Sequence, residues 1–284
     1  MEERIIMKKK SLMVFCLVAS LVFIMAACGG NSKSGAAKIA SPADFPGHNI
    51  AVQVDTTAAF ALDRMIEEDG AKITVSRYEK VTQCFDDLAL GRVDAVYVDS
   101  VVAAYYTTGS DKYKLAWLDS VGEPMGLCMA KSSDKLAAAV EAAIDTMYAD
   151  GSMATIAKKH FGEDFTAGLR DVKSAPAIPK DFTTINAGTL MVGSEIGYPP
   201  MEYTTDDGLE YIGFDIDFSK RLAELLGLKA EFINTAWDGI FFGLEKGEYD
   251  IIISSVSITP ERAEKYILTE PYVSNALCIV TQAG

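Results

Sequence analysis

Histidine is scarce in this chain of 284 residues, which contains only His48 and His160. Neither stands in a recognisable catalytic pattern. The HExxH and GxSxG motifs are absent, and so is a glycine-rich phosphate loop. These absences argue against hydrolytic and nucleotide-dependent chemistry. The sequence therefore predicts a protein that is not an enzyme and that carries no cofactor.

Cysteine is also rare, with five in the chain. Beyond Cys16 and Cys28 only Cys84, Cys128 and Cys278 remain, and their spacing fits neither a metal site nor a CxxC redox pair. Cys84 falls on the apolar face of an expected helix, where a thiol packs as a small apolar group. The sequence predicts no metal site.

Basic residues are outnumbered, since 26 lysines and arginines face 40 aspartates and glutamates and leave a net charge of −14. A surface this acidic repels phosphate backbones. Nucleic acid is therefore excluded as a partner.

Long apolar runs are confined to the N-terminus, where Lys8, Lys9 and Lys10 precede an apolar stretch that ends in Met-Ala-Ala-Cys at residues 25–28. A basic start and a short apolar core are typical of a secretory signal, not of a membrane span. The ending resembles a bacterial lipobox. That resemblance implies cleavage of residues 1–27, a lipid on Cys28, a tether over 28–38 and a place on the outer face of the cell membrane. The alternative is an ordinary signal peptide with an incidental cysteine.

Strand and helix patterns alternate after the tether, with an apolar strand at 49–54 and helical apolar spacing from about Thr57. The alternation stops over 165–188, where prolines and polar residues predict a linker, and it restarts at Leu190. Alternation of this kind predicts an α/β fold.

Hydroxyl side chains cluster at the end of the apolar run that begins at residue 250. Ser254, Ser255 and Ser257 are followed one helical turn later by Arg262. A guanidinium beside hydroxyls and backbone N–H groups is a good receptor for a planar carboxylate. The alternative for these residues alone is a serine-rich strand end with an arginine in solvent.

The segment that reads Ser-Ile-Thr-Pro-Glu-Arg at 257–262 and Leu-Thr-Glu-Pro-Tyr at 268–272 resembles the polar amino-acid family of periplasmic-type substrate-binding proteins, which serve ABC importers. The resemblance implies a two-lobed α/β fold, the periplasmic-binding-protein or Venus flytrap fold. It also implies that Ser255, Ser257 and Arg262, with the adjacent Ser254, hold the α-carboxylate of an amino acid.

Further stretches match the same family. Residues 193–203 are similar to its first strand and loop, and residues 213–217 to its Gly-Phe-Asp-x-Asp helix start. By resemblance, the remaining ligand-binding residues are Glu195 and Tyr198 for the ligand side chain, Trp237 as a pocket wall, Asp99 for the ammonium group and Thr57 for the carboxylate.

Asp55 departs from the family pattern, because it stands where the family has a glycine before its pair of hydroxyl residues. An aspartate is a favourable helix N-cap. Asp55 can therefore cap the helix that follows, but its charge would oppose a bound carboxylate. The effect of this replacement stays open, and it puts the role of Thr57 in doubt.

The order of the halves is exchanged relative to the family, which predicts a circular permutation. The predicted lobes are 39–126 (lobe 2) and 127–284 (lobe 1), with one chain crossover near 125–131. Cys128 and Cys278 fall on the two strands that would join the lobes. They predict either two buried free thiols or a disulfide in the oxidising exterior.

The resemblance implies an extracytoplasmic monomer that binds a free amino acid and delivers it to the permease subunits of an ABC importer. Glu195 favours a polar ligand, with basic amino acids slightly ahead. Two alternatives remain open. One is a hydro-lyase on the same fold, of the cyclohexadienyl-dehydratase kind, and the other is an extracellular sensor domain.

Overall fold

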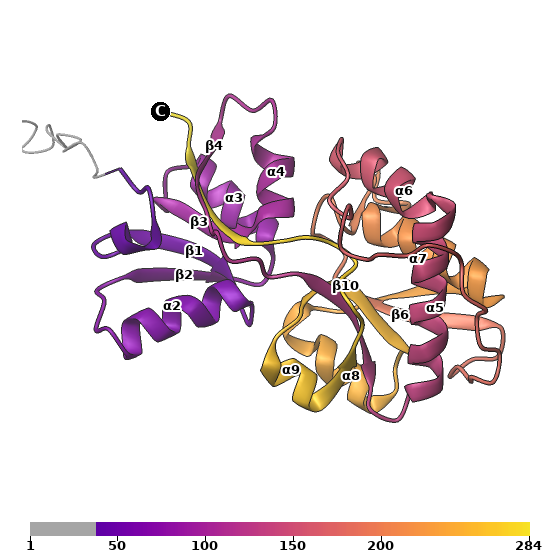
Figure 1. The fold of residues 1–284 in the computed structure, drawn as a ribbon. Coiled ribbons are helices and arrows are strands. Elements are labelled where there is room, and N and C mark those ends of the chain that lie inside the picture. Colours follow the sequence, from indigo (N-terminus) through magenta and orange to yellow (C-terminus); the bar gives the residue numbers. More distant parts are fainter. Residues whose placement is uncertain (1–37) are drawn as a thin grey trace, which may run out of the picture. The chain divides into compact units, whose positions relative to one another are not determined.

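Two five-stranded sheets, each with helices packed on it, make up the unit Ile39–Gly284 (Figure 1). The computed structural model describes residues 38–284. The predicted signal peptide, Cys28 and most of the predicted tether lie outside the described residues. The α/β class with two sheets is confirmed.

The first sheet has the strand order β2-β1-β3-β12-β4. Its strands are β1 (Asn49–Gln53), β2 (Thr74–Tyr78), β3 (Ala95–Asp99), β4 (Tyr113–Leu118) and β12 (Leu277–Gln282). The helices that follow its strands are α2 (Thr57–Glu67), α3 (Val81–Ala89) and α4 (Ser100–Thr107), and a short 3-10 turn, η1 (Pro42–Asp44), precedes β1. The apolar residues of α3 recur at helical spacing and are buried, as the sequence predicts.

The second sheet has the strand order β11-β5-β10-β6-β9. Its strands are β5 (Met125–Ala130), β6 (Thr189–Ser194), β9 (Lys229–Asn234), β10 (Ile251–Ser257) and β11 (Tyr266–Leu268). The accompanying helices are α5 (Asp134–Asp150), α6 (Ser152–Phe161), α7 (Phe214–Leu226), η2 (Trp237–Gly239), α8 (Ile240–Lys246) and α9 (Pro260–Lys265). A small hairpin joins β7 (Tyr203–Thr204) to β8 (Tyr211–Ile212).

The chain passes between the two sheets twice, over residues 119–124 (the first crossover) and 269–276 (the second crossover). They run side by side, because the Glu123 N–H donates to the Asn275 carbonyl at 2.7 Å and the Met125 N–H to the Val273 carbonyl at 3.0 Å. Figure 1 shows them as a magenta and a yellow segment between the sheets.

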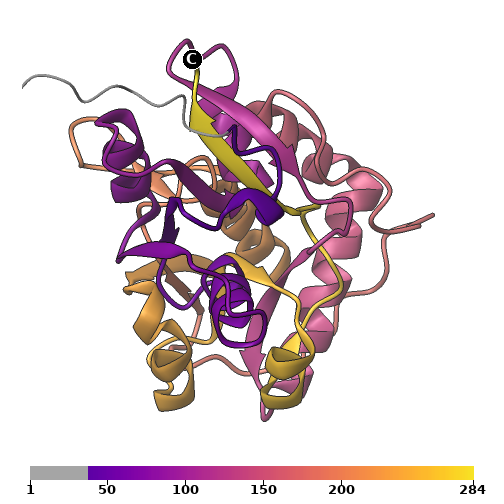
Figure 2. The ribbon, with the colours of Figure 1, turned by 90° about the vertical axis from the view of Figure 1, so that its left-hand side faces the viewer.

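Two crossovers correct the expectation of a single one and of a contiguous lobe 1 over 127–284. Strand β12 lies between β3 and β4 of the first sheet, antiparallel to both (Figure 2, in yellow). Its residues Leu277 to Val280 are all buried. A run that is apolar on both faces needs a central position in a sheet, and the first sheet offers it. The two sheets are therefore connected by two segments of the chain.

The disulfide between Cys128 and Cys278 is absent. The two residues lie in different sheets, and both are buried free thiols, as is Cys84. Burial raises the pKa of the Cys128 thiol to about 12. Of the two predicted alternatives, the structure contains the buried free thiols.

The predicted linker 165–188 contains neither helix nor strand, yet it is fastened to the second crossover. Arg170 pairs with Glu141 at 2.7 Å and Asp145 at 2.9 Å on α5, and it donates to the Glu270 carbonyl at 2.9 Å. The Phe165 carbonyl accepts from the Ser274 N–H. The segment thus packs as part of the fold and is not a free spacer. Over residues 38–284, no helix has both the length and the apolar character that a membrane span requires.

Candidate functional site

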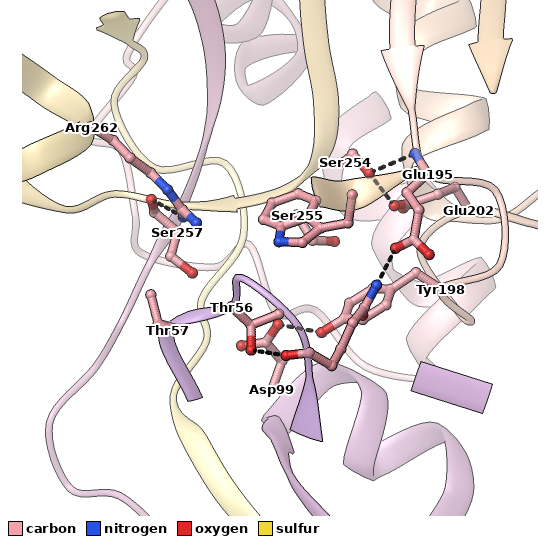
Figure 3. Close-up of a pocket in the computed structure, with 12 residues that line it drawn as sticks. Thr56, Thr57, Asp99, Glu195, Tyr198, Glu202, Ser254, Ser255, Ser257 and Arg262 are labelled. Carbon is pink, nitrogen blue, oxygen red and sulfur yellow. Dashed lines mark hydrogen bonds between the residues drawn. The ribbon is translucent and has the colours of Figure 1, made fainter. Parts of the chain in front are cut away.

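A pocket of about 320 Å³ brings together residues from both sheets (Figure 3). This volume includes the open solvent at the mouth of the pocket. The first sheet contributes the ends of β1 and β3 and the start of α2, and the second contributes the other walls. All nine residues predicted to bind a ligand line it: Thr57, Asp99, Glu195, Tyr198, Trp237, Ser254, Ser255, Ser257 and Arg262. Three more residues complete the lining: Gln53, Thr56 and Glu202.

The serine cluster sits where β10 becomes irregular. The pairing of β10 with β5 shifts register between Ile252 and Val256, and Ser255 has a φ of 52°. Bulges of this kind re-aim side chains near binding sites. The Ser255 hydroxyl is buried without a hydrogen-bond partner in the described part of the chain. Ser254 is already engaged, because its hydroxyl accepts from the Glu195 N–H at 3.0 Å and donates to Glu202 at 2.6 Å.

Arg262 projects from α9, which begins at Pro260 after the N-cap Thr259. Its Nη1 donates to the Ser257 carbonyl at 2.9 Å, and its guanidinium lies 5.5 Å from the ring centre of Trp237. Within residues 38–284, no salt bridge of Arg262 is formed to a carboxylate. Burial lowers the pKa of Arg262. A guanidinium nevertheless stays protonated in proteins, so the pocket contains a largely buried cation that no carboxylate of the described residues contacts within 4.0 Å. The charges of Glu123, Asp99 and Glu261 act on it from a greater distance.

Asp99 ends β3 and provides the opposite charge. The Tyr198 hydroxyl donates to its Oδ2, and the Asn275 side chain donates to its Oδ1 at 2.6 Å. Burial raises the pKa of Asp99 to about 6, while these hydrogen bonds act to lower it. The carboxyl group is therefore mostly ionised at neutral pH and can accept an ammonium group.

Glu195 is 3% exposed and follows β6. Its Oε2 accepts from the Gln53 side chain at 2.9 Å, but its Oε1 has no partner among the described residues. Burial raises the pKa of Glu195 to about 7. A buried carboxylate oxygen without a donor is costly, and a donor-bearing ligand would satisfy it.

Sequence reasoning missed Gln53 and Glu202. Gln53 ends the apolar parallel strand β1, and the carboxyl ends of such strands are where ligands bind in α/β folds, so this signal could have found it. Glu202 is 1% exposed, and burial together with Asp215 raises its pKa well above the usual range. Its Oε2 also lacks a partner in the part of the chain that the structure describes.

Asp55 does not cap the helix that follows it. Thr56, not Asp55, is the N-cap of α2, and its hydroxyl accepts from the Ala59 N–H at 3.2 Å. Asp55 instead has a φ of 55°, a left-handed conformation that suits glycine best and that aspartate tolerates. The Thr57 hydroxyl donates to Glu123 of the first crossover at 2.6 Å.

Several hydrogen bonds join the two walls of the pocket directly. On the side of the second sheet, the partners are the first residue of η2 and residues that follow β6. The pairs are Trp237 Nε1 to the Asp55 carbonyl (3.0 Å), Lys80 Nζ to the Ile196 carbonyl (3.1 Å), Gln53 to Glu195, and Tyr198 to Asp99. The walls are thus in the closed arrangement.

Residues 190–284 match a family of known sequences. The family is that of the bacterial extracellular solute-binding proteins, family 3. This match confirms the predicted resemblance to solute-binding proteins. It includes seven of the nine predicted ligand-binding residues, while Thr57 and Asp99 lie outside it.

Individual relatives match over the same share of the chain. An L-cystine-binding protein of Escherichia coli is 37% identical over 97 residues, 34% of this chain and 36% of that protein. An ABC transporter arginine-binding protein of Escherichia coli is 34% identical over 34% of this chain and 39% of its own. A cyclohexadienyl dehydratase of Pseudomonas aeruginosa is 33% identical over 34% and 36%, respectively. The chain spans just over a third of the length of these relatives.

Proposed function

We propose that the protein acts outside the cytoplasm, where it binds a free amino acid as its zwitterion and delivers it to an ABC importer. One observation carries the proposal: a guanidinium without a counterion, Arg262, shares a pocket with the carboxylate of Asp99 from the other sheet. An α-carboxylate and an α-ammonium would compensate these two charges together. Neither wall satisfies both ends of the ligand, so the ligand favours the closed arrangement by differential affinity.

The pocket favours a basic side chain. Among the lining residues, Asp99 and Glu195 are the acids that ionise near neutral pH, and Arg262 is the one cation. Burial and Asp215 raise the pKa of Glu202 well above its usual range, so Glu202 stays protonated and the excess of negative charge comes from Glu195. Figure 3 places Arg262 and Ser257 at one end and Glu195 and Glu202 at the other. A ligand whose carboxylate pairs with Arg262 would therefore direct its side chain toward the free Oε1 of Glu195. The arginine-binding relative supports this assignment.

The remaining parts of the proposal concern the oligomeric state, the location and the partners of the protein in the cell. The mature chain would be a monomer, held at the outer face of the membrane by a lipid on Cys28, with permease subunits as its partners. The family description as extracellular proteins supports this location. We also propose that the two halves stand in permuted order. The position of β12 supports this order, since it completes a sheet whose other strands come from residues 49–118.

A hydro-lyase is the second candidate, favoured by the cyclohexadienyl dehydratase among the relatives. The buried acids Glu195 and Glu202 could serve as proton donors in such a reaction. An enzyme would convert its substrate during incubation, whereas a binding protein returns its ligand unchanged. Mass analysis of the ligand after incubation separates the two.

A thermal-shift panel of the twenty amino acids with ornithine, citrulline and cystine tests the proposed function. A ligand at a hundred times its Kd stabilises the folded state by about 2.7 kcal/mol. We expect arginine, lysine and ornithine to raise Tm, and citrulline, the neutral analogue of arginine, to raise it much less. A folded protein whose Tm no amino acid changes would contradict the proposal.

Glu195→Gln is expected to weaken arginine binding by about tenfold or more and to reduce the preference over citrulline, because the ligand cation loses its charged partner. In the native protein, arginine affinity should fall as pH falls through about 7, since the cation requires the ionised Glu195. Calorimetric titration between pH 6 and 8.5 measures both effects. Glu210→Gln, which changes an exposed glutamate outside the pocket lining, is the matched control. An unchanged arginine-to-citrulline ratio in Glu195→Gln would contradict the assignment.

A further inference from the structure

Asn275 lies in the second crossover and is 5% exposed. Its side-chain amide bridges the crossover to the first sheet, with Nδ2 2.6 Å from Oδ1 of Asp99 and Oδ1 3.0 Å from the Ser100 N–H. Its own carbonyl accepts from the Glu123 N–H of the first crossover at 2.7 Å. The buried side chain of Asn275 thus contacts the carboxylate of Asp99, while the backbone of Asn275 joins the two crossovers.

The orientation of this amide is determined by its neighbours. The Ser100 N–H can only donate, and the Ser100 hydroxyl also lies 3.1 Å from Oδ1 of Asn275. The carbonyl oxygen of the amide must therefore face Ser100. The NH₂ group then faces Asp99 and donates to it.

We propose that Asn275 is a positioning residue for amino-acid binding, which fixes the Asp99 carboxylate from the hinge so that it can receive the ligand's α-ammonium group. This inference rests on the proposed function. Two donors hold Asp99, and they differ in where they come from. Tyr198 belongs to the opposite wall of the pocket, so its bond depends on closure. Asn275 precedes β12, whose Leu277 pairs with Asp99 in the sheet, so its bond is present whether the walls are open or closed.

The charges around Asp99 explain why a neutral donor is needed there. Burial and Glu123 raise the pKa of Asp99, whereas Tyr198, Asn275 and Arg262 lower it. Cys278, on the neighbouring strand β12, is a neutral thiol whose pKa is raised by burial and by Asp99. In an open molecule Tyr198 no longer reaches Asp99. Of the three groups that lower the pKa of Asp99, only Asn275 then still donates a hydrogen bond directly to its carboxylate. Asn275 thereby preorganises the carboxylate for the incoming ammonium, which reduces the ordering cost of binding.

The test measures the Kd of L-lysine and of 6-aminohexanoate, which is lysine without its α-ammonium group, between pH 5.5 and 8.5. For Asn275→Ala we expect about a tenfold loss of lysine affinity at pH 7.5 and an upward shift of the pH below which affinity declines. The affinity for 6-aminohexanoate should stay unchanged, because that ligand does not use Asp99. Ser274→Ala, the exposed neighbour in the same crossover, is the matched control.

Asn275→Asp serves as a second variant of the same shape, should the alanine variant fail to fold. Its carboxyl group next to Asp99 should make the two acids share a proton, and lysine binding should weaken further, again without loss of 6-aminohexanoate binding. Equal losses for both ligands, or an unchanged lysine Kd and pH profile in a folded variant, would overturn the positioning role alone. Native protein that binds neither lysine nor any other amino acid would overturn the proposed function with it.

Discussion

Arg262→Ala is expected to weaken amino-acid binding by roughly thirtyfold or more while the protein stays folded. Removing one partner of a buried, hydrogen-bonded charge pair costs about 2–5 kcal/mol, and each 1.4 kcal/mol is tenfold in Kd. In this pocket Arg262 is the one charge that attracts the ligand carboxylate, while the ionised Asp99 and Glu195 repel it. The ligand-free variant should lose little stability, because the guanidinium has no carboxylate partner to leave behind within residues 38–284.

Calorimetry and circular dichroism on the purified variant measure binding and folding separately. Lys265→Ala removes an exposed cation from the same helix and is expected to bind like the native protein. Arg262→Lys should recover only part of the lost affinity. The planar guanidinium matches a carboxylate and lies over the ring of Trp237, and an ammonium group has no such planar fork. Near-native affinity in folded Arg262→Ala would remove the carboxylate site.

Asp99→Asn is expected to reduce affinity by a similar factor and, in contrast to Arg262→Ala, to stabilise the ligand-free protein. The folded-state pKa of Asp99, about 6, lies above the ordinary value of an aspartate, 3.8. The folded state therefore holds this proton more tightly, and stability from this group falls as pH rises from about 4 to 6 and stays reduced above. An amide does not ionise, so the variant avoids that cost, and a gain on the order of 1 kcal/mol is expected at pH 7.5.

Denaturant unfolding at pH 4 and 7.5, without ligand, measures the stability difference between the native protein and Asp99→Asn. The gain should be present at pH 7.5 and small at pH 4, where the native carboxyl group is protonated in the folded state. Titration with lysine over the same variants gives the affinity. A variant that is destabilised at pH 7.5 and still binds lysine normally would contradict both the burial cost and the ammonium role of Asp99.

The local patterns predicted much of the fold. The apolar positions of β10 and α3 have the periods of a buried strand and an amphipathic helix, so their burial follows from sequence alone. The place of β12 could not be predicted in this way. Its apolar run fits a central strand of either sheet. The sheet that β12 joins depends on where two neighbouring strands leave a position open between them, and here β3 and β4 do so.

Part of the candidate site could be predicted from the sequence, and part could not. The seven predicted residues between 190 and 284 stand in motifs that the family model also recognises. Gln53 and Asn275 act through partners 142 and 176 residues away in the sequence, Glu195 and Asp99, respectively. No local pattern connects such pairs. The effect of Asp55 could not be predicted either, because an aspartate before a helix can cap it, whereas here Asp55 has a left-handed backbone conformation that no local pattern shows.

The central claim is that one pocket holds both ends of a zwitterion, with Arg262 on one wall and Asp99 on the other. Parallel calorimetric titrations of the native protein with L-lysine, cadaverine and 6-aminohexanoate test it most directly, because the last two ligands lack only the carboxylate or only the α-ammonium group. Lysine is expected to bind at least about thirtyfold more tightly than either analogue, since each analogue leaves one buried charge unpaired. If cadaverine or 6-aminohexanoate bound as tightly as lysine, the corresponding charge would have no role in recognition and the claim would be wrong.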